Sequence, residues 1–162
     1  MELKIKLTTE QLSGIMDLVE SIDDDLMVTY SLEDLCYNTY SPSINIPIEE
    51  YVIMDNEAIK IFKKVLKEEF QKFLLRDLDL LVIAILHEIG HYMTDDDEIA
   101  EKRYLAIGIL EFQKSYKMLS IDELQYRYFK LPGEIDATTW AINYYNSHRK
   151  QCKKLSKLFK KC

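Results

Sequence analysis

The sequence has few of the residues that interrupt helices or cross-link small folds. Its 162 residues include four glycines, three prolines and three cysteines. So few glycines and prolines exclude a β architecture with many turns and favour long helices. The cysteines, Cys36, Cys152 and Cys162, are odd in number and widely spaced. The sequence therefore indicates neither a disulfide framework nor a thiolate zinc site.

Long apolar runs and targeting segments are also missing. The longest apolar stretch, around residues 80–86, is far too short to span a bilayer. The N-terminal segment MELKIKLTTEQ has neither the basic nor the apolar region of a signal peptide. We therefore expect a cytoplasmic, soluble protein that makes no contact with a membrane.

Positive charge is scarce over most of the chain. The net charge is -7, yet seven Lys or Arg and no acid follow from Arg149 onward, so the preceding part carries about -14. Binding to a nucleic-acid backbone needs clustered cations, so we expect no such activity from the acidic body. For the basic C-terminal tail, residues 148–162, we expect a solvated, partly frayed helix. The alternative is a docking or nucleic-acid contact, with Leu155, Leu158 and Phe159 forming an apolar side.

The spacing of apolar residues predicts one domain over residues 1–162, of the α+β class and mostly helical, with a small β-sheet. Strands are expected in ELKIKL, LMVTY and EEYVIMD, and the segment NTYSPSINIP is expected to be irregular. Helices are expected from Thr8 or Thr9 to SIDDDL, and over about 56–75, 77–94, 97–119, 120–129 and 134–147.

Two of the three histidines lie four residues apart, in LLVIAILHEIGHYMT. On a helix, His87 and His91 share one face and can point at the same ion. Neutral imidazole binds Zn²⁺ at about 2.0–2.1 Å. Glu88 is rotated by about 100° and suits a general base that takes a proton from zinc-activated water. Gly90 has no Cβ and would let another backbone approach this helix closely.

A catalytic zinc site needs a third protein ligand and an open fourth position. The best carboxylate is Glu134, which follows a Pro-Gly break in LPGEIDATTWAINYY. Ala137 and Ala141 share its face, so this helix can pack closely against the helix that carries the histidines. Asp136, about 200° around the axis from Glu134, is the competing ligand. His148 lies about 21 Å along the axis from Glu134, so we expect it at the surface.

Together these motifs resemble the glutamate zincins, and most closely the compact ImmA/IrrE-type metallopeptidases. The matching positions are His87, Glu88 and His91, followed by Glu134, Ala137, Trp140 and Ala141. The resemblance covers roughly residues 40–147. It implies a zincin-like core whose active-site helix carries HEIGH, one Zn²⁺ per chain held by two His and one Glu, and often an origin in phages or mobile elements. The sequence departs from the family in INYYNSH, which replaces an LLMP-like segment, and in an added helical segment before Glu134.

This resemblance predicts a zinc metallopeptidase that hydrolyses peptide bonds of a protein or peptide substrate. An alternative is a zincin-fold binding or inhibitor protein that acts on a host factor without proteolysis and uses zinc structurally. Stabilisation of the oxyanion would fall to Tyr126, Tyr128 or Tyr92. The strand EEYVIM is expected to form a sheet edge along which the substrate lies. No feature of the sequence indicates an oligomeric state.

Overall fold

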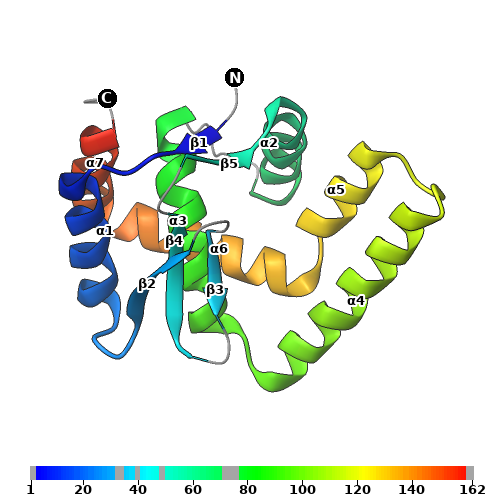
Figure 1. The fold of residues 1–162 in the computed structure, drawn as a ribbon, viewed down its shortest axis with the longest axis horizontal. Coiled ribbons are helices and arrows are strands. Elements are labelled where there is room, and N and C mark those ends of the chain that lie inside the picture. Colours follow the sequence, from blue (N-terminus) through cyan, green and yellow to red (C-terminus); the bar gives the residue numbers. More distant parts are fainter. Residues whose placement is uncertain (1–2, 32–34, 39–40, 48–49, 71–76, 160–162) are drawn as a thin grey trace.

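The chain folds into helices arranged around two small sheets (Figure 1). The computed structural model describes residues 3–31, 35–38, 41–47, 50–70 and 77–159. The helices are α1 (Thr9–Ile22), α2 (Asn56–Phe70), α3 (Asp77–Thr94), α4 (Asp97–Ser115), α5 (Ile121–Phe129), α6 (Pro132–Ser147) and α7 (Arg149–Leu158). The strands are β1 (Leu3–Ile5), β2 (Met27–Ser31), β3 (Cys36–Asn38), β4 (Ser43–Pro47) and β5 (Tyr51–Met54). The fold is therefore α+β and mostly helical, as predicted. Among the described helices, none combines the length and apolarity needed to cross a membrane.

One region of the sheets differs from the prediction. β4 is the central strand of the larger sheet, parallel to β2 and antiparallel to β3. The expectation of irregular chain in NTYSPSINIP is therefore wrong, because β4 lies in this segment and its Ile44 and Ile46 are fully buried. β5 pairs with β1 in a separate two-stranded sheet, so the predicted strand EEYVIM does lie at a sheet edge.

Capping side chains explain where several helices begin. Thr8 Oγ1 accepts a hydrogen bond from the Gln11 backbone N–H, and the Gln11 side chain accepts one from the Thr8 N–H, at 3.3 and 2.8 Å. Asp96 and Ser120 accept equivalent bonds at the starts of α4 and α5. α6 begins at Pro132 rather than at Glu134, because proline fits the first turn of a helix. α2 ends at Phe70, and its expected continuation to residue 75 falls outside the described residues.

Helix α3 runs through the centre of the fold, with α1 and α7 to one side and α2 to the other (Figure 1). From residue 80 to residue 86 every side chain is buried. Its most extensive packing is against α6. A Cβ built on Gly90 would lie 2.4 Å from the backbone oxygen of Ala137, so only glycine permits this approach. The prediction for Gly90 is confirmed, and Ala137 and Ala141 on the facing helix are fully buried.

The basic C-terminal segment is not frayed within the described residues. It forms α7, which packs against α1 and α3. Leu155 and Phe159, two of its apolar residues, are buried in the core together with Cys152. Gln11 on α1 donates a hydrogen bond from Nε2 to the carbonyl oxygen of Leu158 at 3.1 Å, near the C-terminal end of α7. The expected helix is therefore present, but the expectation that it is solvated and partly frayed is wrong for the described residues, because the apolar side of this helix completes the core.

Candidate metal centre

Three side chains converge where α3 meets the N-terminal end of α6. Glu134 Oε2 lies 3.1 Å from His87 Nε2, and Glu134 Oε1 lies 3.6 Å from His91 Nε2. One ligand atom from each residue lies within 4.8 Å of the others, so the group could hold a metal ion. The carboxylate is buried, with Glu134 2% exposed. Two imidazole nitrogens and one carboxylate oxygen are a donor set that fits zinc.

The structure brings Glu134, and not Asp136, to the histidines. Asp136 is exposed on α6 and does not belong to the three-residue group. His148 is also exposed, as predicted, and its ring stacks on Tyr144 with 4.0 Å between the centroids. Its position between α6 and α7 explains why the third histidine cannot join the other two.

The two histidines and the glutamate interact strongly with one another. Burial raises the pKa of Glu134, but hydrogen bonds from His87 and His91 and their charges outweigh it and hold that pKa well below its usual range. Burial lowers the pKa of His87, but the hydrogen bond to Glu134 and the charges of Glu88 and Glu134 raise it overall. The site therefore favours a carboxylate beside positive charge, and a divalent cation supplies that charge once the imidazoles are neutral.

Neighbouring side chains fix the orientation of both imidazole rings. Thr138 Oγ1, one turn after Glu134 on α6, lies 3.0 Å from His87 Nδ1. Asp95 Oδ2 lies 3.6 Å from His91 Nδ1 and can accept its N–H, and the guanidinium of Arg103, which can only donate, forms an ion pair with Asp95 and contacts the same nitrogen. Each ring thus has Nδ1 held by a neighbour and Nε2 directed at Glu134. Such outer contacts position the histidines that bind metals.

Sequence reasoning missed all three of these supporting residues. Two of them had a local signal, because Asp95 is four residues after His91 and Thr138 is four residues after Glu134, the spacing of neighbours on a helix face. Arg103 had none, because it comes from α4 and reaches the site only through the tertiary fold. Its side chain is 8% exposed and passes within 3.3 Å of where a Cβ on Gly133 would lie.

Glu88 lies beside the metal-binding group and is held by the larger sheet. Its Oε2 accepts a hydrogen bond from the backbone N–H of Tyr37 in β3 at 2.9 Å. Burial raises the pKa of Glu88 above its ordinary value, although the charges of His87 and His91 and the Tyr37 hydrogen bond lower it. A carboxyl group with a raised pKa is suited to take and return a proton near neutral pH.

A cavity of about 150 Å³ opens at the metal-binding group. His87, Glu88 and Glu134 form its polar wall, while Ile53 and Met54 of β5 lie among the apolar residues that line it. A water molecule occupies roughly 30 Å³ in the liquid, so this space admits several water molecules or one small group of a ligand.

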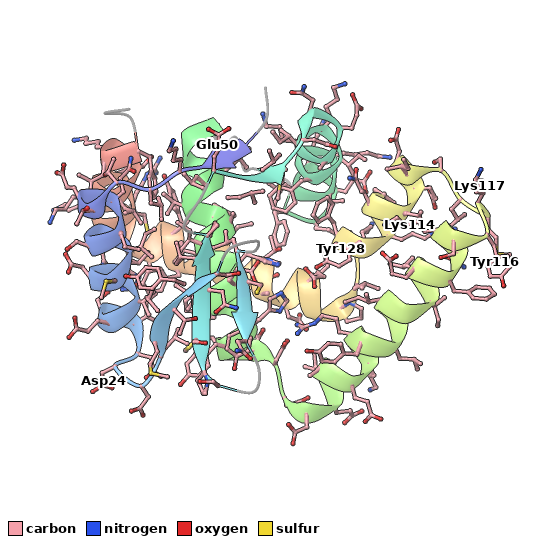
Figure 2. All side chains as sticks on the ribbon, viewed as in Figure 1. Asp24, Glu50, Lys114, Tyr116, Lys117 and Tyr128 are labelled. Carbon is pink, nitrogen blue, oxygen red and sulfur yellow. The ribbon has the colours of Figure 1, made fainter. Side chains whose placement is uncertain are left out.

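Of the three candidate tyrosines, the structure brings Tyr128 to the cavity (Figure 2). Burial raises its pKa, as do the negative charges of Glu134 and Glu88 and a hydrogen bond with Glu134, so its hydroxyl stays protonated at neutral pH. Tyr126 instead donates a hydrogen bond to Glu68 at 2.6 Å. Tyr92 donates one to Asp23 at 3.1 Å. Only Tyr128 among these three is therefore placed to act on a ligand in the cavity.

Comparisons of the chain with protein-family models, with curated proteins and with solved structures find no match. The similarity to the ImmA/IrrE-type metallopeptidases is thus one of short motifs.

Proposed function

We propose that this protein is a zinc-dependent metallopeptidase with a zincin-like core, which hydrolyses peptide bonds of a protein substrate. The observation that carries this proposal is the meeting of Glu134 with His87 and His91 at a cavity that Glu88 also lines. Structural zinc sites usually have four protein ligands, whereas catalytic sites have three and one open position. Among the described residues no fourth His, Cys, Asp or Glu joins this group.

The residues around the cavity suit the steps of amide hydrolysis. Bound zinc would supply a Lewis acid and lower the pKa of water to about 7. Glu88 takes a proton from the attacking water as its oxygen bonds to the carbonyl carbon. Glu88 then passes that proton to the amide nitrogen as the C–N bond breaks. The hydroxyl of Tyr128 donates a hydrogen bond to the carbonyl oxygen as negative charge develops there.

The position of β5 supports an extended peptide as the substrate. Ile53 and Met54 of this strand line the cavity, and β5 lies at a sheet edge. A peptide that adds to such an edge gains backbone hydrogen bonds without any requirement for a particular sequence. This arrangement would carry the scissile bond past the metal-binding group.

One contact favours a second function, that of a binding protein in which the metal is structural. The Glu88 carboxylate is engaged by the Tyr37 backbone N–H, as in a residue that ties a helix to a sheet. In that case Glu88 would serve the fold, and the protein would act on a host factor without proteolysis.

Replacement of Glu88 by glutamine separates the two functions. For a peptidase, Glu88→Gln should reduce cleavage of a denatured protein mixture by on the order of 100-fold or more, with zinc content unchanged, because glutamine cannot accept the proton. The exposed Glu101 gives a matched control, and Glu101→Gln should cleave as the wild type does. Unchanged proteolysis in Glu88→Gln would rule out this mechanism. A biological effect that survives Glu88→Gln would favour the binding protein.

A further inference from the structure

Helices α4 and α5 form a hairpin that extends from the rest of the fold (Figure 1). A groove of about 230 Å³ lies between them. Its apolar lining comes from Ile107 and Leu110 on α4 and from Ile121 and Leu124 on α5. The described residues leave much of this lining uncovered, and Ile121 is 69% exposed. An apolar surface that remains exposed in this way often marks a binding site.

The groove shares one side chain with the cavity at the metal-binding group. Tyr128 borders both the groove and the cavity that contains His87 and Glu134. Figure 2 shows Tyr128 and Lys114 inside the angle between α4 and α5. On α5, Ile121 and Leu124 precede Tyr128 by seven and four residues and therefore lie on the same side of the helix. The groove thus lies along the side of α5 that ends at Tyr128, the side chain that it shares with the cavity.

The dimensions of the groove match a short length of extended peptide. Seven residues of helix span about 10 Å, which corresponds to about three residues of extended chain. The volume of about 230 Å³ exceeds the roughly 150 Å³ of an apolar cavity that accepts benzene. An aliphatic or aromatic side chain therefore fits. At the rim, Lys114 and Glu111 pair with each other at 3.5 Å, so they offer no unbalanced charge to a charged side chain.

We propose that this groove is a specificity subsite, which takes an apolar side chain of the substrate within three residues of the cleaved bond. This inference rests on the proposed peptidase function. The groove is assigned to the substrate because Tyr128 lines both the groove and the cavity that contains His87, Glu88 and Glu134. An apolar side chain that enters it gains burial against Ile107, Leu110 and Leu124, and a charged one would lose hydration against these apolar side chains.

The first test is the cleavage profile on a mixture of peptides from a digested proteome, read by mass spectrometry. The wild type should enrich aliphatic and aromatic residues at one position within three residues of the cleaved bond. Leu124→Glu should slow cleavage of those peptides by about tenfold or more, because it places a charge in the groove. Ile121 is exposed, so Ile121→Glu should leave the fold intact, and it should also slow cleavage of the peptides with an apolar residue at that position. Leu105→Glu, at a position on α4 outside the groove and 69% exposed, should match the wild type.

The second test is binding of the Glu88→Gln protein to a peptide array. Apolar peptides should bind, and adding Leu124→Glu should abolish that binding. Cleavage without any apolar preference would overturn the subsite and leave the peptidase standing. If Glu88→Gln binds the array but the wild type cleaves no peptide, the peptidase function is overturned and the groove remains a peptide-binding site. If there is neither binding nor cleavage, the peptidase function and the subsite are both overturned. If the protein is a dimer, and Leu124→Glu dissociates it without changing the cleavage profile, the groove binds a second copy of the chain and the subsite is overturned.

Discussion

Helices α3 and α6 pack together through small residues, whereas α4 and α5 leave large apolar side chains exposed. In the first pair Gly90 meets the backbone of Ala137, and His91 and Glu134 are less than a tenth exposed. In the second pair Leu105 and Ile121 are each 69% exposed. Close packing holds metal-binding side chains in one geometry, as a catalytic site requires. Exposed apolar surface is instead available to a partner, and here we assign part of it to the substrate.

Arg103 joins the two regions, so its replacement should have the largest effect. Arg103→Met leaves the charge of Asp95 buried without its partner, which should lower the free energy of unfolding by about 3–5 kcal/mol. It should also weaken zinc binding by about 10–100-fold, because Asp95, the acceptor beside His91 Nδ1, loses the partner that holds it in place. Urea unfolding and zinc titration measure the two effects. Lys102→Met, at the adjacent exposed position, should change neither, and equal effects of both variants would contradict the role of Arg103.

Truncation of one leucine in each region tests the difference in burial. Leu86 on α3 is fully buried, so Leu86→Ala should lower the free energy of unfolding by about 3 kcal/mol. Leu105→Ala on α4 should change it by no more than about 0.5 kcal/mol. Denaturant unfolding of both variants gives the comparison. A loss of similar size at Leu105 would mean that the hairpin is buried in solution, for example against a second copy.

Two glycines provide a smaller and sharper contrast. Gly90→Ala should lower the free energy of unfolding by about 1–3 kcal/mol, because the new Cβ collides with the Ala137 backbone. Gly108→Ala should raise it by about 0.5–1 kcal/mol, because a Cβ there meets nothing within 4 Å and alanine favours the helix. Thermal unfolding resolves both signs. Stabilisation by Gly90→Ala would show that α3 and α6 do not meet as described.

The sequence predicted the central site well because its signals are local. HEIGH lies on a strongly apolar helix, and EIDATTWA follows a Pro-Gly break, so the spacing on each helix determined which side chains share a face. What remained to be predicted was the contact between the two helices. Gly90 and Ala137 indicated that contact, because small residues allow two helices to approach closely. The sequence left Asp136 as the competing ligand, because helical geometry shows only that Asp136 and Glu134 cannot face the histidines together; the structure brings Glu134 to them.

The failures lie where tertiary contacts decide the structure. β4 is five residues long and follows Pro42, so the local sequence indicated a turn. It forms a strand because it pairs with β2 on one side and β3 on the other. α7 carries many cations, which suggested a solvated tail, but α1 and α3 cover its apolar side. Arg103 lies on a helix that looks ordinary in sequence, and only the fold places it against His91.

Metal analysis of three purified proteins tests whether His87, His91 and Glu134 hold one zinc ion. After zinc loading and dialysis, the wild type and Asp136→Ala should each retain about one zinc per chain. Glu134→Ala should retain almost none, because removal of the buried carboxylate leaves two ligands. Circular dichroism confirms that each protein is folded. Zinc retained by Glu134→Ala, or none bound by the folded wild type, would contradict the account.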